Sequence, residues 1–312
     1  MEKYNTQIMS MLGLNASVFG LSLLDIASQR DDIIVICADQ SIPAGLEKFK
    51  TQFPEKFINV GIAEQNMIGV AAGLSDEGFV PICVAQACFL SMRSFEPIRQ
   101  FAGYMNKPIV FVGLFSGFST NYMGNTHYAI EDIALMRAIP NMTICSPADP
   151  IEAVKCFESV INLNKPAYIR LWGSTNAPIV YTDNYDFIIN SPTFLRHGND
   201  IQIIATGSMV IQAIKAAELL KNRYNIEASI LNFHTIKPIN TTMLSNDIPI
   251  FTVEEHSVIG GLGDAILSKG YNVTKIGVDD KYSRVGDYNF LLNENNLSSD
   301  QIAELIYLRL NK

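Results

Sequence analysis

Short, nearly continuous apolar runs recur along this chain, and the clearest span residues 33–38 and 108–115. Both are far shorter than the roughly 18 residues that a helix needs to span a bilayer. Runs of this kind are typical of central strands in a parallel sheet, which are buried on both faces. Because helix-like stretches lie between them, the alternation predicts an α/β fold with mainly parallel sheets flanked by helices, and no membrane segment.

One interruption of this alternation divides the chain into two predicted domains. In the first, residues 1–175, we expect strands near residues 33–38, 57–60, 80–85, 108–114, 143–146 and 167–171, and helices near 16–30, 62–77, 91–105, 131–137 and 149–163. Residues 176–199 contain Pro178, Asp183, Asn184, Pro192 and Gly198 and predict a linker. In the smaller second domain, residues 200–312, we expect strands near 201–206, 227–233, 249–254 and 273–278, and helices near 208–223, 261–270 and 299–310.

The composition is that of a globular protein with two sizeable cores, since 48% of the 312 residues are hydrophobic and 17% are charged. A net charge of −8 without a cluster of Lys and Arg argues against a nucleic-acid surface. The cysteines are expected to be buried thiols, because they form no CxxC pair; they are Cys37, Cys83, Cys88, Cys145 and Cys156. With no leader-like start, a cytoplasmic location is the expectation.

Glu64 places a carboxylate at the start of an otherwise apolar helix. Residues 57–60 read as a short strand, Gly61 as a turn, and residues 62–77 as a helix closed by Gly78. Met67, Ile68 and Ala71 would share the face of Glu64. A helix N-terminus favours the ionised carboxylate, whereas apolar burial favours the protonated form, so such a group is suited to sharing a proton. The alternative is a carboxylate that only complements the helix dipole.

The run NVGIAEQNMIGVAAGL around Glu64 resembles the pyrimidine-domain signature of thiamine-diphosphate enzymes of the transketolase group. The resemblance continues through ALMRAIPNMTICSPAD, YIRLWGS, ATGSMV and FTVEEHSVIGGLGDA, in family order, from about Asn15 to about Asp300. It implies a pyrimidine-binding domain followed by a transketolase C-terminal domain. It also implies that Glu64 hydrogen-bonds N1′ of the aminopyrimidine and activates the cofactor.

The same resemblance assigns further cofactor residues. In QACFLSMRSFEPIRQ, Phe89 falls where a family aromatic ring stacks on the pyrimidine, and Arg93 and Phe95 are nearby pocket candidates. Asp39 matches a family Asp that orders the cofactor site, although a cap for the following loop and helix is an equal alternative. His127 matches a loop His that faces the substrate, where it would bind a hydroxyl or transfer a proton.

Several positions depart from the pattern of sugar-phosphate transketolases. The resemblance places Ala16 and Trp172 at positions of phosphate-binding Arg residues, Phe115 near that of a substrate-facing His, and Met123 at that of an Asp. The predicted substrate pocket, His127, Met123, Phe115 and Trp172, has therefore lost phosphate anchors and gained apolar surface. We expect a non-standard acceptor, such as an activated or modified sugar, rather than a simple phosphorylated sugar.

Other family matches are expected to be structural. Arg170 matches a strand Arg that forms an ion pair, and His256 lies in the second domain, away from the cofactor. The glycine-rich residues 260–265 do not meet the GxGxxG spacing of a nucleotide site.

The family holds the cofactor's diphosphate through a metal bound by a GDG segment in a separate domain, and the chain has no GDG. The nearest string, residues 285–288, lies in the wrong domain, so no metal ligands are expected here. The resemblance thus implies a split transketolase whose N-terminal partner subunit supplies the GDG motif and Mg²⁺ or Ca²⁺, in an α2β2 assembly acting on sugars.

Three alternatives stay open. The β subunit of a 2-oxo acid dehydrogenase E1 component is also a split thiamine-diphosphate chain, and deoxyxylulose-phosphate synthase shares several phrases but is normally one chain. A non-catalytic assembly or regulatory subunit is the third, although a carboxylate kept on an apolar face argues for cofactor binding.

Overall fold

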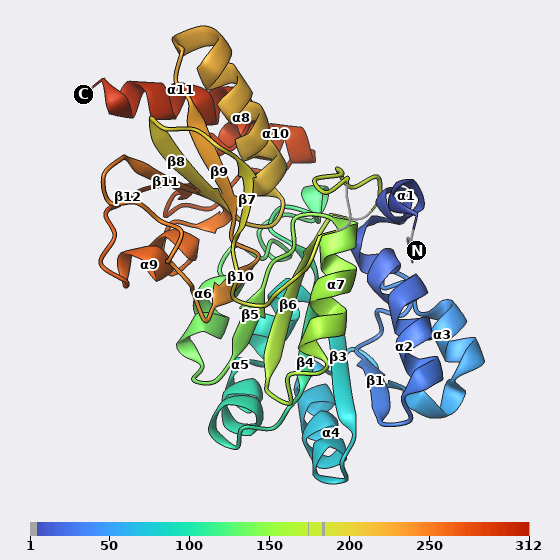
Figure 1. The fold of residues 1–312 in the computed structure, drawn as a ribbon. Helices are drawn as coiled ribbons and strands as arrows, with labels where there is room; N and C mark the ends of the chain where they lie inside the picture. Colours follow the sequence, from blue (N-terminus) through green and yellow to red (C-terminus); the bar gives the residue numbers. More distant parts are fainter. Residues whose placement is uncertain (1–4, 174, 183–184, 312) are drawn as a thin grey trace.

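The computed structural model describes residues 5–173, 175–182 and 185–311. Two sheets, each flanked by helices, form two lobes, with the second domain above the first in the view of Figure 1. The predicted α/β class is confirmed, since the strands within each sheet are parallel except for one antiparallel edge pair in each. Asp183 and Asn184, predicted as part of the linker, lie outside the described residues.

The first sheet has seven strands in the order β10-β5-β6-β4-β3-β1-β2. Its strands are β1 (Ile33–Cys37), β2 (Phe57–Asn59), β3 (Val80–Gln86), β4 (Val110–Ser116), β5 (Thr143–Cys145), β6 (Ala167–Trp172) and β10 (Thr235–Lys237). Its main helices are α1 (Thr6–Ser17), α2 (Leu23–Gln29), α3 (Glu47–Gln52), α4 (Glu64–Asp76), α6 (Asp132–Ala138) and α7 (Pro150–Val160). The carboxyl ends of the parallel strands share one edge of the sheet, where open α/β folds bind ligands.

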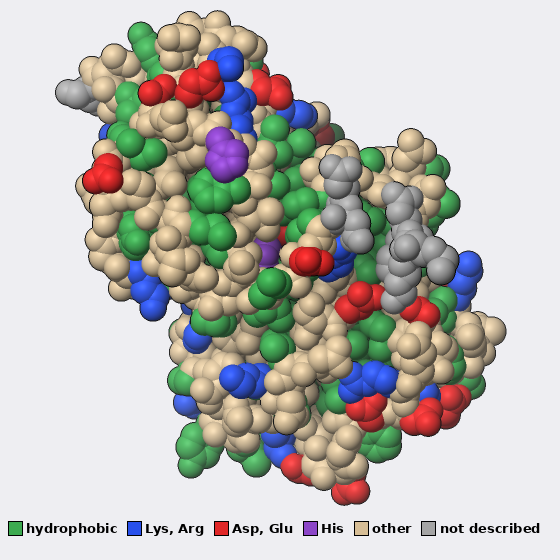
Figure 2. Space-filling model, in the orientation of Figure 1, with side chains coloured by type: hydrophobic (Ala, Val, Ile, Leu, Met, Phe, Trp, Pro, Cys, Tyr) green, Lys and Arg blue, Asp and Glu red, His purple; other side chains and the backbone are tan. Residues whose placement is uncertain are grey.

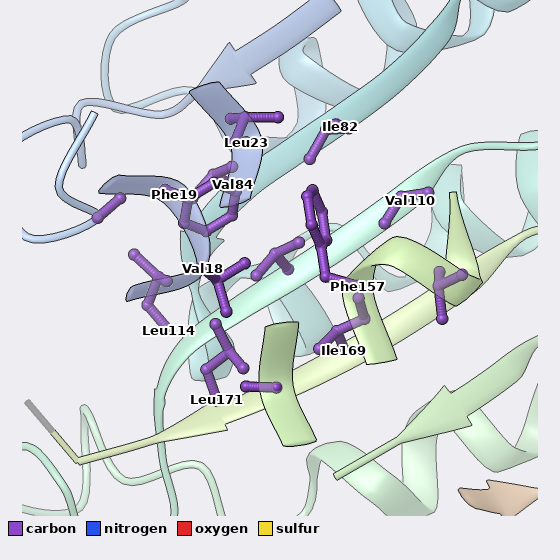
Figure 3. Close-up of a cluster of buried hydrophobic side chains, with 14 of the residues drawn as sticks. Val18, Phe19, Leu23, Ile82, Val84, Val110, Leu114, Phe157, Ile169 and Leu171 are labelled. Atoms are coloured by element: carbon purple, nitrogen blue, oxygen red, sulfur yellow. The ribbon is translucent and has the colours of Figure 1, made fainter. Parts of the chain in front are cut away.

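Side chains alternate between two apolar layers on this sheet, because successive strand residues point to opposite faces. Val35 and Val84 face one core with Phe19 and Phe157, and the neighbouring Ile36 and Cys83 face another with Met67 and Ile68. Figure 3 shows the first layer, in which Phe19 and Phe157 meet edge to face with ring centroids 5.7 Å apart. The second layer carries α4, so burial of its apolar face fixes where Glu64 lies.

The first helical stretch runs from Thr6 to Gln29 and begins well before the predicted residue 16. Asn5 caps it by accepting hydrogen bonds from the backbone N–H groups of Gln7 and Ile8, and Gly13, with φ of 74°, marks a kink. By length and composition alone this stretch could cross a membrane. Leu14, Val18, Phe19 and Leu23 are fully buried against the first sheet, which accounts for its apolar character.

The second sheet has five strands in the order β12-β11-β8-β9-β7. Its strands are β7 (Thr193–Arg196), β8 (Ile201–Ala205), β9 (Ala228–Asn232), β11 (Ile250–Ser257) and β12 (Val273–Val278). Its helices are α8 (Met209–Tyr224), α9 (Leu262–Leu267), α10 (Tyr288–Glu294) and α11 (Ser299–Leu310). The strands and helices predicted for this domain are all present, within a few residues of their expected ends.

Two short antiparallel strands depart from the prediction. β7 lies inside the range predicted as linker and pairs with β9, while β10 follows β9 and pairs with β5 of the first sheet. Each has four residues or fewer and lies at a sheet edge, so neither carries the long apolar run that identifies a central strand. The two domains are therefore joined through a shared sheet as well as through the linker.

The predicted helix at residues 91–105 is three pieces instead of one α-helix. They are the π-helical turn η3 (Phe89–Arg93), the single turn α5 (Phe95–Pro97) and the π-helix η4 (Ile98–Tyr104). Ser94 separates the first two with φ of −101° and ψ of 12°. Wide π turns of this kind occur often at functional sites, and periodicity does not distinguish them from an α-helix.

The surface carries mixed charge on the face shown in Figure 2, where basic and acidic side chains are interspersed over both lobes. All five cysteines are buried free thiols, as predicted.

Candidate cofactor site

Glu64 is the first residue of α4, directly after the strand β2 and the turn at Gly61. Glu64 is 3% exposed, and Met67, Ile68 and Ala71 are fully buried, so the predicted apolar face is confirmed. The N-cap residue, Ala63, makes no side-chain cap. The carboxylate is therefore a buried charge at a helix start, and it needs a polar partner.

Arg93 and Phe89 complete a compact cluster with Glu64. The Nη1 atom of Arg93 donates a hydrogen bond of 2.8 Å to Oε2 of Glu64, and the Arg93 guanidinium carbon lies 4.4 Å from the centroid of the Phe89 ring. Both residues come from the π-helical turn after β3. The structure thus brings together a carboxylate, a half-buried aromatic face and a planar cation at the carboxyl edge of the sheet.

His127 joins this cluster from the loop between β4 and α6. Its ring centroid lies 5.2 Å from that of Phe89, with an interplanar angle of 71°. Its Nδ1 atom is 2.9 Å from the hydroxyl of Thr126, and its backbone N–H donates to the carbonyl of Gly124. The loop therefore holds the imidazole edge-on to the aromatic ring.

Asp39 lies on the same edge, two residues after β1, with φ of 55°. Its carboxylate accepts from Nδ2 of Asn59 at 3.3 Å, while Oδ1 of Asn59 accepts from the backbone N–H groups of Asp39 and Gly61 at 3.1 and 3.0 Å. Asn59 therefore ties the end of β1 to the turn before α4. The alternative role of Asp39 as a helix cap is not seen, since α3 begins at Glu47 with Leu46 as its N-cap.

The other predicted pocket residues are more scattered. Phe95 is half-buried and packs against the core beneath α4, Phe115 (φ 55°) packs against the core on the opposite face of the sheet, and Met123 is 54% exposed. The structure therefore does not bring Phe115 together with His127 in one pocket. The positive φ of Phe115 and the register shift of β4 between Gly113 and Ser116 break the strand alternation, so its ring packs in the same core as the preceding Leu114.

Trp172 ends β6 and is nearly buried, with its indole N–H donating to the carbonyl of Pro147 at 3.3 Å. It lines a hollow of about 290 Å³ at the junction of the two domains. The described lining is uncharged and consists of Ser119, Asn121, Trp172, Gly173, Thr175, Asn176, Ala177, Pro178, Ser208, Ile211, Gln212 and Tyr288.

Arg170 is the structural residue that the sequence predicted. It forms a fully buried ion pair with Asp132 at 2.8 Å and donates to the carbonyls of Ala129 and Glu255 at 2.9 Å each. Since Glu255 lies on β11, this arginine fastens the second domain to the first.

His256 and the glycine-rich turn are also structural. Burial lowers the pKa of His256 to about 4, so the ring is neutral, donating from Nδ1 to the carbonyl of Ser257 and accepting at Nε2 from the Ala134 N–H. The carboxylate of Glu254 accepts from the N–H groups of Leu262 and Gly263 at 2.6 and 2.9 Å. This carboxylate occupies the N–H groups to which a nucleotide phosphate would bind, so the structure agrees with the prediction that the turn is not a nucleotide site.

Metal ligands of the required kind do not gather anywhere in the described ranges, where no group of three or more His, Cys, Asp or Glu could hold an ion. Asp287, in the string nearest to GDG, caps α10 by accepting from the N–H of Phe290 at 2.8 Å. The residues present therefore fit the aminopyrimidine of thiamine diphosphate, through a buried carboxylate beside an aromatic face, and offer no cluster for the metal that would hold its diphosphate.

Two residues of the cluster are missing from the predicted set. Asn59 orders the strand end beside Asp39, and Gln65 donates from Nε2 to the carbonyl of Arg93 at 3.0 Å. Both lie inside the run that carries the family resemblance, and this position is the sequence feature by which they could have been predicted as site residues.

Comparison with known proteins places these observations in a family. The transketolase pyrimidine-binding domain matches residues 15–174, and the transketolase C-terminal domain matches residues 193–291. A putative transketolase C-terminal section from Methanocaldococcus jannaschii is 35% identical over 304 residues, covering 94% of this chain and 95% of that relative. A 6-deoxy-6-sulfo-D-fructose transketolase subunit from a Clostridium species is 34% identical, covering 90% of this chain and 89% of its own.

A solved structure gives the same answer for the fold. A split-gene transketolase, described as an inactive β4 tetramer, superposes with a TM-score of 0.84 and 33% identity, covering 96% of this chain and 99% of its own. Sequence, domain order and fold agree over nearly the whole length. This chain belongs to the transketolase family, as the C-terminal subunit of a split transketolase that carries the pyrimidine-binding and C-terminal domains.

Proposed function

We propose that this chain supplies the aminopyrimidine half of a thiamine-diphosphate site in a two-component transketolase, which transfers a two-carbon ketol unit from a ketose donor to an aldehyde or ketone acceptor. The observation that carries the proposal is the buried carboxylate of Glu64 beside the half-buried ring of Phe89. A charge on an apolar helix face is costly unless a partner compensates it. A cofactor ring with a hydrogen-bonding edge is such a partner.

Thiamine diphosphate, when bound, supplies an electron sink for the carbanion formed from the donor. Glu64 would hold a proton at Oε2 against the ring nitrogen N1′, and Phe89 would give the ring a flat apolar support and exclude water from that contact. Asp39 and Phe95 would form the surrounding wall, and the backbone of Arg93, held by Gln65, would border it. Glu64 begins α4, Phe89 lies on η3 and Phe95 on α5, while Asp39 lies in the loop after β1.

His127 is the proposed substrate-facing residue. The hydroxyl of Thr126 lies beside its Nδ1, so Nε2 is the nitrogen that would meet a substrate hydroxyl or move a proton. The edge-on contact with Phe89 would hold the imidazole next to the cofactor ring. In this arrangement His127 acts on the substrate while Glu64 acts on the cofactor.

The acceptor is proposed to be larger or less phosphorylated than a simple sugar phosphate. The hollow beside Trp172 has an uncharged described lining, and a phosphate dianion needs charge-assisted hydrogen bonds. Met123 is proposed to face the substrate from the exposed loop before His127, outside the described lining of this hollow, whereas the core position of Phe115 argues against direct substrate contact by its ring. Efficient turnover of xylulose 5-phosphate with ribose 5-phosphate would contradict this acceptor class.

The partner is proposed to be an N-terminal transketolase subunit that binds the diphosphate through Mg²⁺ or Ca²⁺, in an α2β2 assembly within the cytoplasm. The lack of a metal-binding group in the described residues and the five free buried thiols support this proposal. Mass measurement of the co-purified complex tests the stoichiometry.

The decisive experiment replaces Glu64 by Gln and measures activity after reconstitution with the partner. We expect a loss of about 100-fold or more in kcat, the lower end of general acid–base effects, with assembly intact. The control is Glu77→Gln, which changes an exposed carboxylate just after the other end of the same helix. Unchanged activity of the Glu64 variant would instead support the non-catalytic assembly role.

A further inference from the structure

Arg93 contacts both groups that we propose for the aminopyrimidine. Its guanidinium donates to Oε2 of Glu64 at 2.8 Å and lies over the ring of Phe89 at 4.4 Å from the centroid. A flat cofactor ring that contacts the same carboxylate and stacks on the same aromatic face would occupy the position of the Arg93 guanidinium. Arg93 and the ring are therefore competitors for one position.

The guanidinium resembles the aminopyrimidine in the features that matter for this place. It is planar, it stacks on aromatic rings, and its N–H donors lie in its plane, where they meet a carboxylate edge-on. An ammonium group has no such plane. An arginine can thus satisfy both the face of Phe89 and the carboxylate of Glu64, as the cofactor ring would.

The electrostatics explain why this place is filled. Glu64 is 3% exposed, and within the described part of the chain Arg93 is the side chain that hydrogen-bonds its carboxylate. A buried carboxylate without a partner is costly. Arg93 compensates that charge when the cofactor ring is absent.

The geometry also allows Arg93 to leave. Its side chain is 45% exposed, although the Glu64 side chain it contacts is only 3% exposed. Arg93 ends the π-helical turn η3, and Nε2 of Gln65 donates to its backbone carbonyl at 3.0 Å. The backbone would stay in place while the side chain rotates into solvent.

We infer that Arg93 is an internal occupant of the aminopyrimidine position, which neutralises Glu64 in the unloaded chain and must rotate away before cofactor binds. This inference rests on the proposed function of Glu64 and Phe89. The Arg93–Glu64 contact and cofactor binding then exclude each other. The apparent association constant for the ring is therefore the intrinsic constant multiplied by the fraction of chains in which Arg93 has left.

The test uses the full chain and a probe that needs only this half of the site, 4-amino-5-hydroxymethyl-2-methylpyrimidine, with binding measured by calorimetry. We expect Arg93→Ala to bind the probe on the order of tenfold more tightly than the natural chain, as the loss of one cation–π contact and one half-exposed ion pair implies. Arg93→Lys should fall between the two, because its ammonium pairs with Glu64 but stacks poorly. Arg99→Ala is the matched control, since Arg99 lies nearby in sequence, on η4, in an exposed pair with Glu96.

The outcomes separate this inference from the function on which it rests. If Arg93→Ala binds the probe equally or more weakly while Glu64→Gln abolishes binding, Arg93 is no competitor, the inference is overturned and the proposed function stands. If Glu64→Gln and Glu64→Gln/Arg93→Ala bind as tightly as Arg93→Ala, the proposed cofactor site is itself wrong. If no variant binds at millimolar probe, the inference is also overturned, because removing the occupant should open the position.

Discussion

Two arginine–carboxylate pairs in the first domain have the same length and opposite surroundings. Arg170 and Asp132 lie 2.8 Å apart with side chains 2% and 0% exposed, whereas Arg93 and Glu64 lie 2.8 Å apart with side chains 45% and 3% exposed. The first pair is enclosed on both sides. The second has one partner that reaches the carboxylate from solvent.

The difference corresponds to different roles. Arg170 also donates to two backbone carbonyls, one in each domain, and the hydroxyl of Tyr168 donates to Asp132 at 2.7 Å, so this pair cannot separate without leaving several buried groups unsatisfied. Arg93, in contrast, contacts the Glu64 carboxylate and the face of the Phe89 ring. The enclosed pair joins the domains, and the open pair can exchange its cation for another ligand.

The largest expected effect comes from breaking the enclosed pair with Arg170→Met. We expect a loss of about 3–5 kcal/mol in the free energy of unfolding, because the variant leaves the Asp132 carboxylate buried without its cation. Urea unfolding measures it. The control is Arg223→Met, which removes an exposed pair with Asp300 and should cost less than about 1 kcal/mol. Comparable losses in the two variants would contradict the structural role of Arg170.

A second prediction concerns acidification of the same junction. His256 is buried beside Asp132, Arg170 and Glu254, and burial lowers its pKa to about 4 from 6.5. Since the unfolded chain takes up this proton first, the stabilisation by neutral His256 is present above pH 6.5 and is lost as the pH falls towards 4. We expect the stability advantage of the natural chain over His256→Gln to shrink by roughly 2 kcal/mol between pH 7 and pH 5.

The comparison with His256→Gln is needed because a neighbouring group titrates in the opposite sense. Burial raises the pKa of Glu254 to about 7 from 4.5, so the folded chain holds that proton longer and loses stability as the pH rises through this range. Urea unfolding of both proteins at several pH values isolates the histidine. An advantage that stays constant with pH would show that His256 does not carry this linkage.

The sequence predicts the parts of the fold that depend on local pattern. Central strands such as β1 and β4 are long apolar runs, and the face of α4 follows from the spacing of Met67, Ile68 and Ala71 after Glu64. The short edge strands β7 and β10 form by pairing with strands that are distant in the sequence. The π turn of η3 depends on tertiary packing. Neither leaves a periodic signal.

The candidate site divides in the same way. The family resemblance predicts cofactor roles for Glu64 and Phe89, and in the structure both lie in one cluster through Arg93. That Arg93 bridges them could not be predicted, because the contact requires the turn after β3 to meet the start of α4. The pocket role predicted for Phe115 assumed regular strand alternation, but a positive φ and a register shift at the end of β4 turn that ring into the opposite core.

The smallest expected effect comes from the open pair, and it sharpens the contrast with the enclosed one. A double-mutant cycle of Glu64→Gln and Arg93→Met in the unloaded chain should give a coupling of only about 0.5 kcal/mol, since Arg93 is half-exposed and screened by water. Added salt should reduce this coupling further, because solvent-exposed charges are screened over about 10 Å at 0.1 M. The matching cycle of Asp132→Asn and Arg170→Met should give a larger coupling that salt leaves unchanged. If the Glu64–Arg93 coupling is as large and as insensitive to salt as the Asp132–Arg170 coupling, Arg93 is a fixed structural partner. That result would contradict the inference that the cofactor ring displaces it.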